Sequence, residues 1–517
     1  MTESTKTADL LKQYAHVEGK PVIASWMGGP DVEAGVNILN QAGIPTFDYP
    51  DTAARMFTNM YKYSENLASI YETPSLDDEF DPQHVAGSTY AATKIIEQVR
   101  AEGRNLLTEF ESKQVLAAYR IPTVETYRAT TTDEAVSAAA KLGFPVVLKL
   151  DSRLITHKTD VGGVKLNLQD ETAVRDAFEG IRRRVLEINS KAFDGVTVQK
   201  MVKFPDSYEL IVGSSPDSQF GPVLLFGAGG VLVEIFKDKA LGLPPLNNTL
   251  ALRMMEQTKI FHALEGVRGR RPVDIELLQN VMVRFSRLVV EQRWIKEIDI
   301  NPLLAGPDGV VALDARVLLY DANTDPANLP QTAIRPYPSQ YVTPWKSSDG
   351  TNILFRPIRP EDEPLLVKFH ETLSERTVRL RYFHPMKLGA RTTHERMIRV
   401  CFNDYDRELA IVAEQTEANG EKTILGVGRL SKVPHQNEAE FAVLVSDLHQ
   451  RKGIGSRLLE MLLAIARDEK VALVKADVLT DNHEMQAVCR KLGFTLKQDL
   501  DDGTVKASID PTKAKPA

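Results

Sequence analysis

The stretch HQRKGIGSRLL constrains the fold more than any other, because it joins the apolar run EFAVLV to a segment with helical spacing. Gly453 and Gly455 remove side chains at this join, where a backbone can then come close to a ligand. Arg451, Lys452 and Arg457 add positive charge around the same point. A helix start also offers unpaired N–H groups and the positive end of its dipole. The stretch predicts a strand, a turn and a helix with a site for a phosphate or pyrophosphate. A turn that only connects the two elements is the alternative.

Length and composition are those of a globular protein with several domains. The 517 residues exceed the roughly 100–200 of one domain, and the net charge of −7 gives no basic footprint for nucleic acid. No apolar run approaches the ~20 residues that span a bilayer, and the polar start lacks the form of a secretory signal. Two cysteines, Cys401 and Cys489, are too few for a disulfide framework. We therefore expect a cytoplasmic protein that binds neither nucleic acid nor membrane.

The pattern of apolar residues changes along the chain and predicts several domains. The first part alternates strand and helix, as in KPVIASWMGG followed by DVEAGVNILNQAG, which implies a parallel sheet. Two such strands make a poor sheet, so we expect part of a larger domain and a chain that begins within a fold. The next part mixes short strands with helices such as TTDEAVSAAAKLG, and a proline-rich, semi-rigid linker follows it. The expected boundaries are 1–105 for the partial domain, 106–322 for the middle domain, 323–350 for the linker, 351–510 for the last domain and 511–517 for a tail.

Four pieces of the middle domain have the chemistry of a nucleotide site. Lys149 follows the apolar run PVVL, where a lysine needs a functional or packing reason. HKTDVGGVKL supplies a glycine pair for a loop over phosphates. KEIDINPLL places Asp299 and Asn301 on one face of a strand, and VVALDARV places Asp314 in an apolar strand. Hard oxygen ligands of this kind suit Mg²⁺ that bridges nucleotide phosphates.

The last domain continues the opening stretch with the strand-like ALVKADVL and the helix DNHEMQAVCRKLGF. This order resembles the GNAT N-acetyltransferases, whose phosphate-binding signature, Gln/Arg-x-x-Gly-x-Gly/Ala, matches Gln450-x-x-Gly453-x-Gly455. KLGF stands at its expected place downstream. The resemblance implies an α/β GNAT domain that holds the pyrophosphate of acetyl-CoA on the amides of this turn. The acetyl-CoA-binding residues that it implies are Gln450, Arg451, Lys452, Gly453, Ile454, Gly455 and Asn482.

Transfer of an acetyl group to an amine also requires a group that accepts a proton from the amine. A lysine with a pKa of about 10.4 is almost wholly protonated near pH 7, so a general base helps. The resemblance implies Glu440 as this base, direct or through water, with a solvated strand-end carboxylate as the alternative. For Asn482 it implies a place near the pantetheine arm, with a simple N-cap as the alternative. Where many GNAT enzymes have a tyrosine that protonates the leaving thiolate, this chain has Cys489, so the leaving-group acid stays open.

The region before the GNAT-like domain resembles the ADP-forming acyl-CoA synthetases and succinyl-CoA ligase β chains, in LTEFESKQVLAAYRIPT, FPVVLKL, HKTDVGGV, FGPVLLFGAGG and EIDINPL. The resemblance implies a partial flavodoxin-like, succinyl-CoA-synthetase-like parallel unit followed by an ATP-grasp domain. ATP or ADP with Mg²⁺ would bind there. Its implied site residues are Lys149 for nucleotide phosphate, Asn301 and Asp314 for Mg²⁺, Gln199 to Val202 for the adenine, Glu209 as a further candidate, and His157 as a phosphoryl relay or an ordinary loop histidine.

Together the two regions resemble the bacterial Pat-type protein lysine acetyltransferases, in an N-terminally truncated form. RPIRPEDEPLLVKFHETLSE, RYFHP and DYDRELAIVAE carry this resemblance. It implies acetyl transfer from acetyl-CoA to a protein lysine, such as one in an acyl-CoA synthetase, with a regulatory ligase-like region. The CoA-binding Rossmann domain and the phosphohistidine domain of the ADP-forming acyl-CoA synthetases do not occur in this sequence, so we expect acyl-CoA synthesis to fail in this chain alone.

Two other functions stay open from the sequence. One is an ADP-forming acetate–CoA ligase component of β type that needs an α-type partner. The other is a non-catalytic sensor of acyl-CoA and ATP. The sequence leaves the target lysine, the acyl chain and the oligomeric state open.

Overall fold

A computed structural model describes residues 3–70, 82–155, 158–202, 204–230, 238–267, 269–347, 349–417, 419–499 and 502–515. The chain divides into two compact units, one made of the residues up to Thr73 with the short segment Arg359–Pro364, and one made of the rest. Among the described residues, no helix has both the length and the apolar character needed to cross a bilayer.

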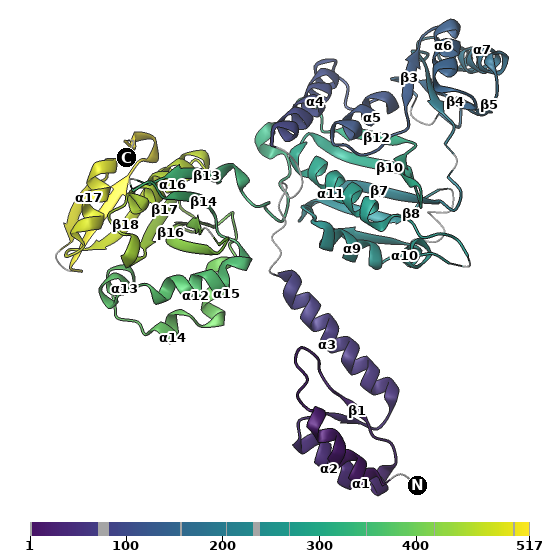
Figure 1. The fold of residues 1–517 in the computed structure, drawn as a ribbon. Helices are drawn as coiled ribbons and strands as arrows, with labels where there is room; N and C mark the ends of the chain where they lie inside the picture. Colours follow the sequence, from purple (N-terminus) through teal and green to yellow (C-terminus); the bar gives the residue numbers. More distant parts are fainter. Residues whose placement is uncertain are drawn as a thin grey trace. The chain divides into compact units, whose positions relative to one another are not determined.

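The N-terminal unit contains the parallel strand pair that the alternating pattern predicts. Ala24 lies opposite Thr46, and Ser25 opposite Phe47. Its small core includes Ala8 and Leu39 from two helices. The parallel pairing is thus confirmed, although each strand is only two residues long. The elements are α1 (Ser4–Leu11), η1 (Lys12–Tyr14), β1 (Ala24–Ser25), η2 (Gly29–Val32), α2 (Glu33–Gln41), β2 (Thr46–Phe47) and α3 (Pro50–Ile70) (Figure 1).

The middle domain has two antiparallel sheets (Figure 1). A four-stranded sheet, ordered β3-β6-β4-β5, packs against α6 and α7. A six-stranded sheet, ordered β11-β10-β7-β8-β9 with β12 beside β10, shares one core with α4, α5, α9, α10 and α11. The bounds are α4 (Pro82–Ala101), α5 (Glu109–Ala118), β3 (Thr126–Ala129), α6 (Thr132–Leu142), β4 (Val146–Asp151), β5 (Val164–Leu168), α7 (Glu171–Ile188), β6 (Gly195–Lys200), β7 (Tyr208–Asp217), β8 (Gly221–Ala228), β9 (Lys239–Gly242), α9 (Asn248–Glu256), α10 (Lys259–Leu264), α11 (Ile275–Glu291), β10 (Ile295–Gly306), β11 (Gly309–Ala312) and β12 (Ala315–Leu319).

Helix α6 shows how the local sequence sets an element's ends. The Thr131 side chain accepts from the Glu134 N–H, and the Glu134 carboxylate accepts from the Thr131 N–H, so the predicted capping box is present. Gly143 ends the helix with a φ of 77°, a conformation that glycine adopts without strain.

The segment 323–350, expected to be a linker, contains structure that belongs to the last domain. Its strand β13 (Thr343–Lys346) pairs with β14, and the hydroxyl of the buried Tyr337 donates to the Pro357 carbonyl at 2.8 Å. Two short turns, η3 (Pro326–Asn328) and η4 (Ser339–Tyr341), precede β13. The last domain thus uses residues before its expected start at residue 351, because an added strand covers an otherwise open sheet edge.

The last domain is an eight-stranded sheet, ordered β13-β14-β15-β16-β17-β18-β20-β19. Residues of α16 and α17 pack on one face, and residues of α12, α13 and α15 pack on the other. After η7, Lys515 N–H donates to the Leu492 carbonyl at 3.1 Å, so part of the expected tail packs on the domain. The bounds are β14 (Asn352–Pro357), η5 (Pro360–Asp362), α12 (Glu363–Glu371), α13 (Glu375–Tyr382), α14 (Leu388–Arg391), α15 (His394–Cys401), β15 (Glu408–Thr416), β16 (Lys422–Lys432), β17 (Glu438–Val445), η6 (Asp447–His449), α16 (Ile454–Asp468), β18 (Leu473–Leu479), α17 (His483–Leu492), β19 (Thr495–Asp499), β20 (Thr504–Ile509) and η7 (Pro511–Lys513).

Candidate functional site

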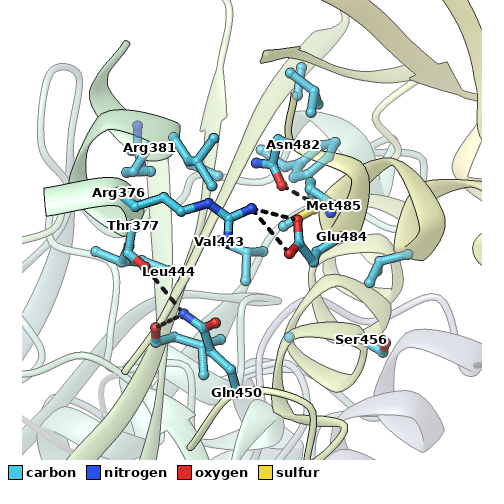
Figure 2. Close-up of a pocket in the computed structure, with 18 of the residues that line it drawn as sticks. Arg376, Thr377, Arg381, Val443, Leu444, Gln450, Ser456, Asn482, Glu484 and Met485 are labelled. Carbon is cyan, nitrogen blue, oxygen red and sulfur yellow. Dashed lines mark hydrogen bonds and ion pairs between the residues drawn. The ribbon is translucent and has the colours of Figure 1, made fainter. Parts of the chain in front are cut away.

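The sheet of the last domain opens between its two parallel strands. β17 and β18 pair only from Glu438 to Glu440 on β17, where Glu440 lies opposite Lys475, and the ladder ends there. A cavity of about 380 Å³ lies beyond this point, lined by Phe441–Val445 of β17 and by Ala476, Asp477 and Val478 of β18 (Figure 2). Residues of the glycine turn, α13 and α17 also line it. The separation of two strands therefore creates room for an extended ligand arm between them.

The glycine turn stands at this cavity as the sequence predicts. Arg451 and Gly453 have φ values of 62° and 90°, the left-handed conformation in which a side chain is disfavoured. A Cβ on Gly453 would make only an ordinary contact, 3.4 Å from the Trp345 ring of β13, so the left-handed backbone and not a lack of space favours glycine there. Ile454 begins α16 with a buried side chain, and Gly453 and Gly455 on either side of it line the cavity. The unpaired N–H groups of that helix start can hold a phosphate group.

The polar residues of the turn have distinct positions. The Gln450 amide donates to the Val445 carbonyl and to the Thr377 hydroxyl, each at 3.3 Å, so this side chain ties the turn to β17 and α13. Lys452 pairs with Asp349 at 2.9 Å, and this contact is the first cause that lowers the pKa of Asp349. Of the predicted acetyl-CoA residues, Gln450, Arg451, Gly453, Gly455 and Asn482 line the cavity.

Glu440 lies at the inner end of the opening without lining the cavity itself. Its side chain is exposed on β17, and it is the last residue before the two strands separate. The neighbouring Glu438 pairs with Lys475 at 2.9 Å, whereas no such pair is found for Glu440 among the described residues. Glu440 and Ala442 share one face of β17 because side chains alternate, and Ala442 lines the cavity. This position gives an exposed carboxylate at the point where the two strands separate.

Two residues at α17 bear on alternatives that the sequence left open. The Asn482 carboxamide oxygen accepts from the Met485 N–H at 3.1 Å, so Asn482 is an N-cap, and it also lines the cavity. Cys489 is fully buried and does not line the cavity, and burial raises the pKa of its thiol to about 12. A thiol that holds its proton so firmly and lies outside the cavity is a poor acid for the leaving group.

The middle domain gathers charges around a residue that the sequence analysis missed. Glu109 at the start of α5 is buried, and its carboxylate accepts from Lys149 at 2.9 Å, from Lys158 at 2.5 Å and from the Gln199 amide at 2.8 Å. Lys113 pairs with the same carboxylate at 2.9 Å. Although burial raises the pKa of Glu109, the three lysines together hold it well below its ordinary value. The spacing of Glu109 and Lys113 at i and i+4 in LTEFESKQ was the local signal for part of this cluster.

Lys149 connects this cluster to a predicted metal ligand. Its ammonium also donates to the Asp314 carboxylate at 2.9 Å and to the Leu313 carbonyl at 3.1 Å. Burial lowers the pKa of Lys149, but the charges of Glu109 and Asp314 outweigh it and leave the pKa raised. Asp314 lies between β11 and β12, so its expected place inside a strand is wrong. The chain turns there because β11 and β12 pair with different parts of β10.

Asn301 and Asp314 come together at the end of one ladder. In the pairing of β10 with β12, Asp299 lies opposite Arg316 and Ile300 lies opposite Ala315. The same register brings Asn301 next to Asp314. Two oxygen side chains of this kind suit Mg²⁺ in chemistry, with phosphate and water for its other ligands. The described residues hold no cluster of three or more histidine, cysteine, aspartate or glutamate side chains for a metal.

Two of the other predicted nucleotide residues lie near those already described. Gln199 is buried within the Glu109 cluster, and Val202 lies half-buried just beyond β6. Glu209 is exposed on β7, and Gly230 lies between it and Asn301, since the Gly230 N–H donates to Asn301 at 3.3 Å. His157 lies outside the described residues.

Comparison with known proteins supports the assignment of both domains. Family models match residues 98–319 as an ATP-grasp domain and residues 378–494 as the acetyltransferase (GNAT) family. The β subunit of ADP-forming acetate–CoA ligase I of Pyrococcus furiosus is 41% identical over 229 residues, which are 44% of this chain and 97% of that subunit. An acetyltransferase of Pseudomonas aeruginosa is 28% identical over 162 residues, 31% of this chain and 85% of that protein. The crystal structure of the GNAT domain of S. lividans PAT is 29% identical, with a TM-score of 0.30, and the match covers 34% of this chain and all but 1% of that domain.

These findings define a chain in which an ATP-grasp domain is joined to a GNAT N-acetyltransferase domain. Through its ATP-grasp domain, the chain belongs to the family of ADP-forming acyl-CoA ligases. It spans less than half the length of the 4-hydroxybutyrate and acetate ligases of this family, from Nitrosopumilus maritimus and Archaeoglobus fulgidus, that it matches.

Proposed function

We propose that the chain transfers an acetyl group from acetyl-CoA to the ε-amine of a protein lysine, such as one in an acyl-CoA synthetase. The observation that carries this proposal is the cavity between β17 and β18, with an anion-binding turn at one end and Glu440 where the strand pairing stops. The turn would hold the pyrophosphate of acetyl-CoA, and the separated strands would hold its pantetheine arm. The thioester would then lie toward Glu440.

The chemistry follows from this placement. The neutral lysine Nζ attacks the thioester carbonyl carbon, the carbon–sulfur bond breaks, and coenzyme A leaves as a thiolate with the bonding electrons. The proton lost from the amine passes to Glu440, directly or through water. The buried Cys489 takes no part, so the thiolate leaves without an acid from this position.

The ATP-grasp domain would bind nucleotide in a regulatory role. Lys149 and Lys158 would contact phosphate, and Asn301 with Asp314 would hold Mg²⁺, which neutralises phosphate charge. Lys149 now uses its three N–H donors on Glu109, Leu313 and Asp314, so it would reach phosphate once Asp314 turns to Mg²⁺.

The direct test measures thiol release from acetyl-CoA by the full chain with an acetyl-CoA synthetase as acceptor, and follows labelled acetyl onto protein by mass spectrometry. Glu440→Gln should lower the rate by about 100-fold or more, the usual worth of a general base. Glu438→Gln is the matched control, because Glu438 lies on the same strand as Glu440 and its carboxylate is paired with Lys475 of β18, and it should retain most activity. Binding of acetyl-CoA without transfer would contradict the proposal and favour a sensor.

A second candidate is the β-type component of an ADP-forming acetate–CoA ligase. The match to nearly the whole Pyrococcus furiosus β subunit favours it. This function requires an α-type partner with a phosphohistidine. Co-purification of such a partner, with ATP made from acetyl-CoA, ADP and phosphate, would support it, and failure of that reaction with the partner supplied would exclude it.

A further inference from the structure

Arg376 lines the acyl-CoA cavity, yet it lies two residues before the segment that matches the GNAT family. Hydrogen bonds connect its helix, α13, to the glycine turn and to the residues just before it. The Ser374 N–H and the Thr377 hydroxyl each donate to the Asp447 carboxylate at 2.8 Å, and the Gln450 amide donates to the Thr377 hydroxyl (Figure 2). The base of the Arg376 side chain is therefore held next to the turn.

Across the cavity, Arg376 meets Glu484 in the first turn of α17. Its guanidinium donates to the two carboxylate oxygens at 3.2 and 3.4 Å, and Figure 2 shows this contact spanning the space between the two walls. Arg451 of the turn acts on the same carboxylate. The backbone N–H at Glu484, then Arg376 and Arg451, hold the pKa of Glu484 below its ordinary value, against its slight burial. Arg376 is thus the direct partner of Glu484, and Arg451 of the turn lies near enough to influence the same carboxylate.

The Arg376–Glu484 pair is suited to exchange. The two side chains are 63% and 53% exposed, and pairs this accessible to water contribute little to stability. A guanidinium that contacts phosphate oxygens in a bidentate way makes a stronger interaction. Arg379, on the same helix, pairs with Asp481 but does not line the cavity, so it offers a matched comparison.

We propose that Arg376 binds the pyrophosphate of acyl-CoA from α13, beside the glycine turn, and that Glu484 of α17 holds Arg376 in place until the ligand arrives. When acyl-CoA binds, the phosphate oxygens replace the Glu484 carboxylate as partner of Arg376, and Arg451 joins from the turn. This inference rests on the proposed function, because it assigns a residue to the same acyl-CoA cavity.

The test is titration calorimetry of acetyl-CoA into the full chain and three variants. Arg376→Gln should weaken binding by about 10- to 100-fold, the range for a lost hydrogen bond between charged groups. Glu484→Gln should strengthen binding several-fold, because it removes the competing partner. Arg379→Gln should change the affinity by less than about two-fold, since its partner Asp481 lies outside the cavity. The acetyl thioester of dephospho-CoA, which lacks the 3′-phosphate, should show the same loss in Arg376→Gln.

Each contrary result has a definite meaning. Equal affinity in the wild type and Arg376→Gln overturns the inference while the proposed function stands. Weaker or unchanged binding in Glu484→Gln overturns the exchange of partners. A loss that disappears with the dephospho thioester assigns Arg376 to the 3′-phosphate and overturns the pyrophosphate assignment. A wild-type chain that does not bind acetyl-CoA removes both the proposed function and this inference.

Discussion

The two sites of this chain hold their charges in opposite ways. In the ATP-grasp domain, the Glu109 side chain is 2% exposed and has three lysines around it. In the GNAT domain, Arg376 and Glu484 are more than half exposed and hold each other loosely. A buried charge cluster keeps its geometry because any missing partner is costly, whereas an exposed pair can exchange partners at little cost. The first arrangement suits a rigid phosphate site, and the second suits a cavity that must admit a long ligand.

The largest effect is expected at the centre of the buried cluster. Glu109→Gln leaves three lysines near a neutral amide, so the free energy of unfolding should fall by about 3–5 kcal/mol. Urea unfolding of the full chain, followed in the ATP-grasp transition, measures this. The control is Glu111→Gln on the same helix, where glutamine can keep the cap but the partly exposed ion pair with Arg104 loses its charge, and about 1 kcal/mol is expected. Similar losses in the two variants would break the comparison.

The pH dependence of stability gives the next effect. Burial, the first cause, lowers the pKa of Lys113 from 10.5 to about 8, although Glu109 opposes the shift. Between these values the unfolded chain binds more protons than the folded one, so the contribution of Lys113 to stability rises with pH from about 8 to 10.5. Lys113→Met should remove this increase in the free energy of unfolding, which is on the order of 1–3 kcal/mol. Urea unfolding measured from about pH 8 to 10.5 tests it. Lys191 is exposed, so Lys191→Met should keep the increase in stability with pH. An unchanged dependence of stability on pH in Lys113→Met would show that the pKa of the Lys113 amine is not lowered.

A smaller effect separates the two roles of Asn482. Asn482→Ala removes the cap of α17 and should cost about 1 kcal/mol of stability. Asn482→Asp keeps an acceptor for the Met485 N–H, so stability should be retained. If the Asn482 amide also contacts the pantetheine arm, the aspartate variant should still raise KM for acetyl-CoA. Unchanged KM in Asn482→Asp would leave capping as the only role.

The smallest effect is expected for the exposed pair. Arg376→Gln and Glu484→Gln should each change the free energy of unfolding by less than about 0.5 kcal/mol, because water screens the pair. Thermal unfolding of the GNAT domain transition in the full chain measures this. A loss above about 2 kcal/mol would mean that the pair is structural, and the contrast with Glu109 would fail.

Local patterns in the sequence determined much of the fold and part of the site. The order of the domains, the capping box at Thr131, the parallel pair of the first unit and the strand, turn and helix around Gly453 all depend on neighbouring residues. Spacing and residue type are enough for such features, because hydrogen bonds to nearby backbone groups decide them.

Tertiary structure alone decided which distant side chains meet. Glu109 receives Lys149 and Gln199 from strands 40 and 90 residues further along the chain. Arg376 meets Glu484 across 108 residues, and β13 joins a sheet from within a segment that its prolines mark as a linker. These contacts depend on how sheets and helices pack, and no local spacing encodes that. The sequence therefore determined what chemistry each segment carries, and packing determined which charges are buried with partners and which stay exposed at a cavity.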